Sequence, residues 1–216
     1  VGFNNMKIVY QFECFLFDWD GCLADTLTIW MREYQKQFAK RNLFPSESNI
    51  ASIFGDYEGP GKLGAADNKE FVSQLFANVE TSLPSVKLHT NALETLKKLK
   101  ARNKKTAVLT SSKRNSVWPI VQKFEVDKYI DLFLGGEDVT KHKPDPEIVY
   151  KALEKLGCQK EQTIIIGDSD KDILSGKAAG VSTMIYYPEI NHKYYQEADL
   201  KKLIPDFFIT NFQELL

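Results

Sequence analysis

The feature that most constrains the fold is a regular alternation of short apolar runs and helical patterns after about residue 88. The run Thr163-Ile-Ile-Ile166 consists of β-branched residues and is typical of a strand that is buried on both faces. Strands that alternate with helices across short loops form a parallel sheet with helices on both of its faces. The strands that we predict are Glu13–Phe17, Thr106–Leu109, Leu132–Leu134, Thr163–Ile166, Ser182–Tyr186 and Phe207–Ile209.

Residues 25–88 do not fit this alternation, because helical spacing dominates them. Apolar side chains recur every three or four residues from about Asp25 to Arg41 and again from about Asn68 to Glu80. A segment rich in glycine, Phe54–Gly61, separates the two patterns and is predicted to be a loop. We therefore predict a small helical cap domain, residues 25–88, inserted after the first strand of a core that comprises residues 1–24 and 89–216.

Charge and composition give no sign of a nucleic-acid or membrane partner. Twenty-eight basic residues stand against 29 acidic residues, which leaves a formal net charge of −1 and no electrostatic footprint for nucleic acid. No apolar run approaches the roughly 20 residues that span a bilayer. The three cysteines lack metal-type spacing, as in proteins of a reducing compartment. We expect a cytoplasmic protein that is a monomer or a small homo-oligomer.

Chemically active residues follow three of the predicted strands at the point where each strand ends. Ligands of open α/β sheets bind beyond the carboxyl ends of the strands, near the point where strand order reverses. Carboxylates that meet at one such edge repel one another unless a cation neutralises them, and Mg²⁺ suits carboxylates combined with a substrate phosphate. The polar segments are Asp18–Gly21, Thr110–Ser112 and Gly167–Asp172, and Lys143 precedes a helix that starts at Asp145-Pro146.

Each of these segments by itself has an ordinary structural explanation. A lone Asp-x-Asp is usually a solvated turn, and a hydroxyl residue after a strand is usually a helix cap. Their joint occurrence in this order, at the ends of sheet strands, favours a catalytic site.

Taken together, the four segments resemble the motifs of the haloacid dehalogenase superfamily, in its phosphoglycolate phosphatase-like and β-phosphoglucomutase-like branch. The resemblance runs from about Phe12 to Leu216 and is weakest in the cap. It implies a three-layer, Rossmann-like α/β core and an Mg²⁺-dependent phosphatase that acts on a small phosphorylated metabolite. The matching stretches are Phe17–Thr26, Val108–Ser111, Lys143–Pro146 and Ile166–Ile173.

The resemblance also implies a role for each matching residue. Asp18 would be the nucleophile that forms a phospho-aspartate intermediate. Asp20 would protonate the leaving oxygen and then activate water, and its backbone carbonyl would bind the metal. Thr110 would hold the phosphoryl oxygens, with Ser111 as a rival contact.

Three further residues complete the implied site. Lys143 would stabilise the nucleophile and the transferring phosphoryl group. Asp168 would bind Mg²⁺ directly, together with Asp18. Asp172 would bind the metal through water or orient Lys143.

Two alternatives to a phosphatase stay open. A phosphosugar mutase would keep both Asp18 and Asp20, but it also needs a second phosphate site in the cap. A catalytically silent binding protein would be expected to lack one of the four motifs. The glycine-rich cap loop offers Lys62 as a candidate contact for an anionic group of the substrate, although a solvated lysine is an equally good interpretation.

Overall fold

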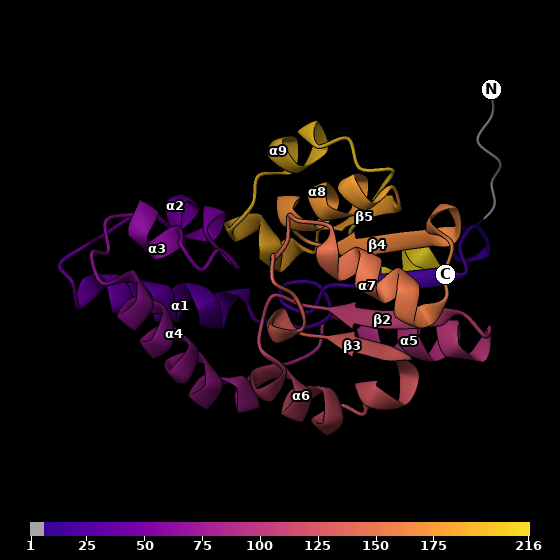
Figure 1. Cartoon of the computed structure of the whole chain (residues 1–216), viewed down its shortest axis with the longest axis horizontal. Coiled ribbons are helices and arrows are strands. Elements are labelled where there is room, and N and C mark those ends of the chain that lie inside the picture. Colours follow the sequence, from indigo (N-terminus) through magenta and orange to yellow (C-terminus); the bar gives the residue numbers. More distant parts are fainter. Residues whose placement is uncertain (1–6) are drawn as a thin grey trace.

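A six-stranded parallel sheet forms the centre of the protein (Figure 1). The computed structural model describes residues 7–216, apart from the side chain of Pro84, so the first six residues of the predicted core lie outside the described residues. The strand order β3-β2-β1-β4-β5-β6 reverses direction between β1 and β4. All six predicted strands are confirmed: β1 (Cys14–Phe17), β2 (Lys105–Leu109), β3 (Leu132–Leu134), β4 (Thr163–Gly167), β5 (Ser182–Tyr186) and β6 (Phe207–Ile209).

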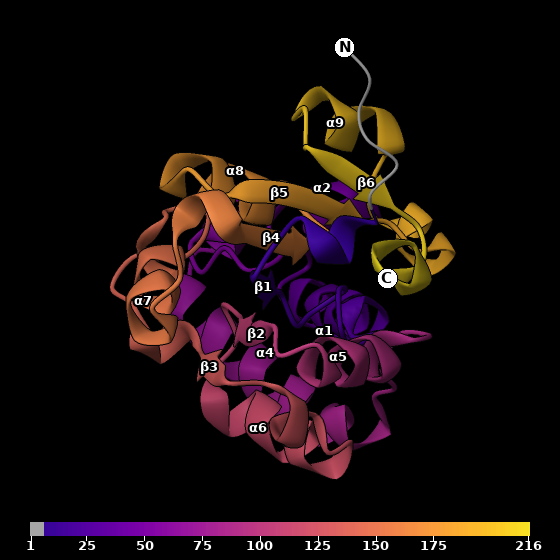
Figure 2. The ribbon, with the colours of Figure 1, turned by 90° about the vertical axis from the view of Figure 1, so that its right-hand side faces the viewer.

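Helices cover both faces of the sheet, because the side chains of each strand point alternately to the two faces. Phe15 and Phe17 of β1 join a core with α5 and α6, whereas Leu16 packs in a second core with α7 and α8. Figure 2 shows α7 and α8 on one side of the sheet and α5 on the other. The core helices are α5 (Ala92–Ala101), α6 (Arg114–Lys123), α7 (Glu147–Leu156), α8 (Asp170–Ala179) and α9 (Glu197–Lys202).

The helices between β1 and β2 include a compact group beyond the carboxyl ends of β2 and β3 (Figure 1). Two long helices, α1 and α4, pack against each other, with the rings of Phe38 and Phe71 only 4.6 Å apart. The predicted α/β fold with a helical insert after β1 is therefore confirmed, while the boundaries at residues 25 and 88 stay a prediction. The group consists of α1 (Leu27–Ala39), α2 (Glu47–Ser52), α3 (Gly59–Lys62) and α4 (Asn68–Ser82).

Two short cap helices were not predicted from the sequence. Ser46 caps α2 by accepting a hydrogen bond from the backbone N–H of Asn49 at 3.2 Å. The segment that was predicted to be a loop ends in α3, which has a proline in its first turn. Short helices of this kind escape periodicity analysis because they contain too few apolar residues to define a face.

The remaining regular segments are single 3₁₀ turns that connect the longer elements. Within residues 7–216, no helix combines the length and the apolar character needed to cross a membrane. The 3₁₀ turns are Ile8–Tyr10, Leu83–Ser85, Val126–Tyr129, Gly136–Asp138, Lys160–Gln162, Glu189–Lys193 and Phe212–Leu215.

Candidate active site

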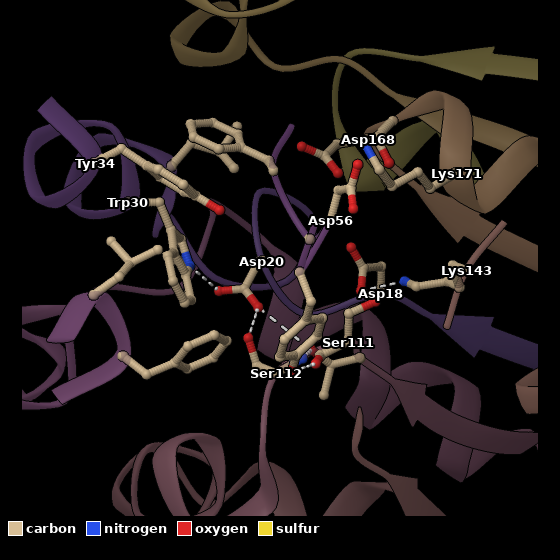
Figure 3. Close-up of a pocket in the computed structure, with 18 of the residues that line it drawn as sticks. Asp18, Asp20, Trp30, Tyr34, Asp56, Ser111, Ser112, Lys143, Asp168 and Lys171 are labelled. Carbon is tan, nitrogen blue, oxygen red and sulfur yellow. Dashed lines mark hydrogen bonds and ion pairs between the residues drawn. The ribbon is translucent and has the colours of Figure 1, made fainter. Parts of the chain in front are cut away.

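All of the predicted site residues except Lys62 gather at the carboxyl ends of β1, β2 and β4, beside a cavity between the core and the cap that is partly open to solvent (Figure 3). The backbone N–H of Asp18 donates to Ile166 at 2.8 Å and continues the ladder between β1 and β4. Thr110 does the same for β2 by donating to Leu134 at 3.0 Å. Parallel pairing thus brings the ends of distant strands to one edge of the sheet.

Three buried carboxylates lie side by side at this edge. Asp18, Asp168 and Asp172 each offer one oxygen atom, and these atoms lie within 4.8 Å of one another. Burial, followed by repulsion from Asp172, raises the pKa of Asp18 to about 7. Burial and the charge of Asp18 likewise raise the pKa of Asp168 well above its usual range. Such a cluster favours either bound protons or a hard cation.

Lys143 neutralises part of this negative charge. Its Nζ donates to Asp18 Oδ1 at 2.7 Å, to Asp172 Oδ1 at 2.6 Å and to the carbonyl of Leu109 at 3.2 Å. Burial opposes the charge of Lys143, but the carboxylates of Asp172 and Asp18 outweigh it and raise the pKa of the amine. Lys143 therefore stays protonated and holds one oxygen of Asp18.

Asp172 is held in place by the start of helix α8. Its Oδ2 accepts hydrogen bonds from the hydroxyl of Ser169 at 2.8 Å and from the backbone N–H of Ser169 at 3.3 Å. Ser169 is the N-cap and Asp172 the third helical residue, which is the capping-box arrangement. Since its other oxygen contacts Lys143, Asp172 is better placed to orient the lysine than to bind a cation directly.

Asp168 packs against the turn that follows β1. A side chain at Gly21, which has a φ of +75°, would place its Cβ 2.1 Å from Asp168 Oδ2, so only glycine fits there. The amide of Asn191 donates to the carbonyl of Gly21 at 2.9 Å and to Asp168 Oδ2 at 3.4 Å. Asn191 was not identified from the sequence, because it lies in a 3₁₀ turn far from every motif.

The donor set fits a magnesium ion. Asp18 and Asp168 supply carboxylate oxygens in a buried, negatively charged position, as the ion requires. Asp18 accepts a hydrogen bond from Lys143 through Oδ1, and Asp168 accepts one from Asn191 through Oδ2. Asp172 is the predicted ligand whose oxygens are already occupied.

Asp20 points toward the cap and away from the acidic cluster (Figure 3). Its Oδ1 accepts hydrogen bonds from the hydroxyl of Thr26 at 2.7 Å and from the indole of Trp30 at 2.8 Å. Its Oδ2 accepts from Ser112 at 2.8 Å and from Thr110 at 3.3 Å. Asp20 therefore joins the start of α1 to the loop after β2.

Two of these partners, Trp30 and Ser112, differ in how far the sequence identified them as site residues. Helical periodicity assigned Trp30 only to the apolar face of a cap helix. The signal that could have revealed it is its spacing, since Trp30 follows Thr26 by four residues and so lies on the same helix face. Ser112 belongs to the segment Thr110–Ser112 that was already singled out.

The two remaining predicted contacts differ in position. Ser111 lines the cavity, and its carbonyl accepts a hydrogen bond from the hydroxyl of Tyr57 on the cap at 2.9 Å. Lys62 lies outside the cavity lining, pairs with Asp56 at 2.6 Å and has a side chain that is 65% exposed. Lys171, within the motif after β4, lines the cavity instead and was not identified from the sequence.

The comparisons with known proteins agree with this geometry. The family model of the haloacid dehalogenase-like hydrolases matches residues 15–186. A putative pyrophosphatase PpaX of Clostridium perfringens is 30% identical over 208 residues, covering 93% of this chain and 94% of that protein. A phosphoglycolate phosphatase of Photorhabdus laumondii is 31% identical over 144 residues, covering 67% of this chain and 54% of that protein.

Among solved structures, a putative haloacid dehalogenase-like hydrolase from Bacteroides fragilis has the same fold. The TM-score is 0.83 at 24% identity, covering 94% of this chain and 99% of that chain. The predicted family resemblance is thus confirmed by motifs, fold and overall similarity. Because the family model matches well over half of its length, this chain belongs to the haloacid dehalogenase-like hydrolase family.

Proposed function

We propose that this protein is an Mg²⁺-dependent phosphatase that hydrolyses a small phosphate monoester through a phospho-aspartate formed on Asp18. The observation that carries the proposal is the convergence of Asp18 with Lys143 and Asp168 at the carboxyl ends of β1 and β4. The sequence relatives are named as phosphatases and pyrophosphatases, which supports the same class of reaction.

In the first step, a free oxygen of Asp18 attacks the phosphorus atom. A new bond forms between this oxygen and phosphorus while the bond from phosphorus to the ester oxygen breaks. Lys143 binds the other oxygen of Asp18 and offsets negative charge as the phosphoryl group transfers. When bound, Mg²⁺ supplies charge stabilisation for the carboxylates and the phosphoryl oxygens.

Asp20 supplies the proton that the leaving oxygen needs. It then takes a proton from the water molecule that attacks the phospho-aspartate, so that Asp18 and inorganic phosphate are released. Asp20 must give up part of its bonding to Trp30 and Ser112 to reach the ester, because both of its oxygens accept hydrogen bonds there. Rotation about its side-chain torsions is sufficient for that movement.

The phosphoryl oxygens are held by groups on the core side of the cavity. Thr110 and Ser111 line the cavity and carry hydroxyl groups, and Ser111 also carries a backbone N–H, whereas the N–H of Thr110 donates to Leu134. Asp172 is proposed to orient Lys143, since the two are 2.6 Å apart. Lys62 stays a predicted substrate contact, and the cap must rearrange for it to reach the cavity.

Hydrolysis is favoured over a mutase reaction by the charges on the cap. A mutase has to hold two phosphate groups, and the second needs its own cations. On the cap, Lys62 is already paired with Asp56, and most of the cap residues that line the cavity are apolar.

The experiment that tests the proposal is rapid-quench trapping of the intermediate. A ³²P-labelled ester should transfer label to the wild-type protein in the presence of Mg²⁺ and release labelled phosphate on longer incubation. Asp18→Asn should retain no label and release no phosphate. Retention of label or release of phosphate by the Asp18→Asn variant would exclude Asp18 as the nucleophile. Asp170→Asn is the control, because Asp170 is exposed and lies outside the cavity lining.

A further inference from the structure

The cap contributes an apolar, ring-lined wall to the active-site cavity. This cap wall faces the polar strand ends across the cavity (Figure 3). The hydroxyl of Tyr34 points toward the cavity, whereas the other side chains offer mainly hydrocarbon and aromatic surface. The cap wall consists of Trp30, Tyr34, Phe54, Val72, Leu75 and Phe76.

Two helices supply the cap wall except for Phe54, which follows α2, and their residues are at helical spacing. Trp30 and Tyr34 are four residues apart on α1. On α4, Leu75 and Phe76 follow Val72 by three and four residues, so they lie on the same helix face. The rings of Trp30 and Phe76 meet edge to face at 5.2 Å. Both rings are only half-buried, so a ligand can cover the surface that they expose.

The charged cap residue that lines the cavity, Asp56, is unfavourable for a second anionic group. Burial favours the neutral form of Asp56, but its hydrogen bond to Lys62 prevails and lowers the pKa of the carboxyl group. Asp56 therefore carries a negative charge where it lines the cavity. An anion beside Asp56 meets the carboxylate directly, because its partner Lys62 lies outside the cavity lining.

Lys171 does not make this part of the cavity favourable for an anion. Its Nζ lies 3.8 Å from Asp170 and donates to the carbonyl of Ser52 at 3.4 Å. Among the described residues that line the cavity, the other lysine is Lys143, which is held by Asp18 and Asp172. Binding of a second phosphate or a carboxylate calls for more cationic groups than these.

We propose that the substrate is a phosphate monoester of an alcohol that carries an aromatic ring, with the ring against the cap wall. This inference rests on the proposed phosphatase function and names the substrate class of the same site. It differs from the substrates in the names of the sequence relatives, since pyrophosphate and phosphoglycolate both carry a second anionic group.

A matched pair of esters tests the inference. Ethyl phosphate and 2-phenylethyl phosphate release similar alkoxides, so a difference in kcat/KM reports recognition of the ring rather than leaving-group reactivity. We expect kcat/KM to be at least about tenfold higher for the phenyl ester, because burial of a ring on the cap wall provides that much stabilisation. Phosphoglycolate and pyrophosphate should be poorer substrates than the phenyl ester.

Substitutions in the cap wall test whether this surface binds the ring of the substrate. Phe76→Ala should reduce the preference for the phenyl ester over ethyl phosphate about fivefold or more. Phe44→Ala removes a ring that is 82% exposed and lies outside the cavity lining, so it should leave the preference unchanged. Val72→Lys places a cation on the cap wall and should raise kcat/KM for phosphoglycolate relative to the phenyl ester, a gain that misfolding cannot imitate.

The outcomes separate this inference from the proposed function. Hydrolysis of both esters at equal kcat/KM, or a preference for phosphoglycolate or pyrophosphate, overturns the inference and leaves the phosphatase proposal standing. A preference for the phenyl ester that Phe76→Ala does not reduce also overturns it. If the protein hydrolyses no phosphate ester in the presence of Mg²⁺, the proposed function itself fails.

Discussion

The two sides of the active-site cavity are built by different physical means. On the core side, buried charged groups hold one another through short hydrogen bonds, as Lys143 does with Asp18 and Asp172. On the cap side, rings such as Trp30 and Phe76 are held by packing between α1 and α4.

The core side carries the charged groups of the reaction, and the cap side carries the surface that would select the substrate. A buried charge network tolerates little change, because removal of one partner leaves the others uncompensated. An apolar surface tolerates substitutions that conserve its volume. The core side is therefore suited to a fixed reaction, whereas the cap side is suited to a choice among substrates. Substitutions on the two sides should accordingly differ in the size and the kind of their effects.

After the complete loss of activity expected for Asp18→Asn, the largest effect is expected for Asp20, which is bonded to both sides. Asp20→Asn should slow steady-state hydrolysis of an alkyl phosphate by about two to four orders of magnitude, because the leaving oxygen and the water lose their proton-transfer partner. The measurement is kcat for 2-phenylethyl phosphate and for p-nitrophenyl phosphate, whose leaving group needs less protonation and should be less affected. An equal loss on both esters in single-turnover formation of the phospho-aspartate would show that Asp20 does not protonate the leaving oxygen.

A smaller effect, on stability, is expected from the acidic cluster of the core side. The pKa of Asp18 is about 7 in the folded protein against an ordinary value of 3.8. Between these two values, the unfolded chain releases a proton that the folded protein keeps, so the free energy of unfolding of the metal-free protein falls as pH rises from about 4 to about 7. Mg²⁺ favours the ionised cluster and should offset this loss.

Thermal denaturation with EDTA or with saturating Mg²⁺ checks this expectation. Mg²⁺ should raise Tm by about 5 °C or more at pH 7.5 and by much less at pH 5.5. The Asp18→Asn variant should show a weaker dependence of Tm on pH, since the amide that replaces the carboxyl group does not titrate. A larger Mg²⁺ effect at pH 5.5 than at pH 7.5 would contradict the assignment of the metal to this cluster.

The smallest effect is expected on the cap surface. Lys62→Ala should change kcat/KM by less than about twofold, because Lys62 is exposed and outside the cavity lining. The same assay on Lys171→Ala is the matched comparison, since that lysine lines the cavity. A large loss for Lys62→Ala alone would show that the cap rearranges to bring this lysine to the substrate.

Much of the core side could be predicted from the sequence, whereas the contacts of Asp20 could not. Asp18 and Asp168 directly follow apolar runs, so their place at the sheet edge follows from strand periodicity alone. The contacts from Trp30 and Ser112 depend on how α1 is oriented relative to the loop after β2. Nothing local in the sequence encodes that orientation.

The arrangement of side chains in the cap could be predicted from the sequence even less well. Helical spacing predicted that Trp30 and Phe71 lie on amphipathic helices, but not which ring faces the interior of the cap and which faces the cavity. Phe71 is fully buried and Trp30 is half-buried, although both belong to apolar helix faces. Lys62 was expected in a flexible loop, and it lies instead on α3 with Asp56 as its partner.

The sequence by itself therefore determined the parallel sheet, its helical insert and the position of Asp18 at the end of the first strand. These features follow from short-range patterns, since strand burial and helix faces repeat every two or about 3.6 residues. Tertiary structure alone decided that Asp172 holds Lys143, that Asp20 is bonded to the cap, and that the rings of Trp30 and Phe76 line the cavity. Those arrangements depend on contacts between residues far apart in the chain, and the relative placement of α1, α4 and the strand ends decides which contacts form.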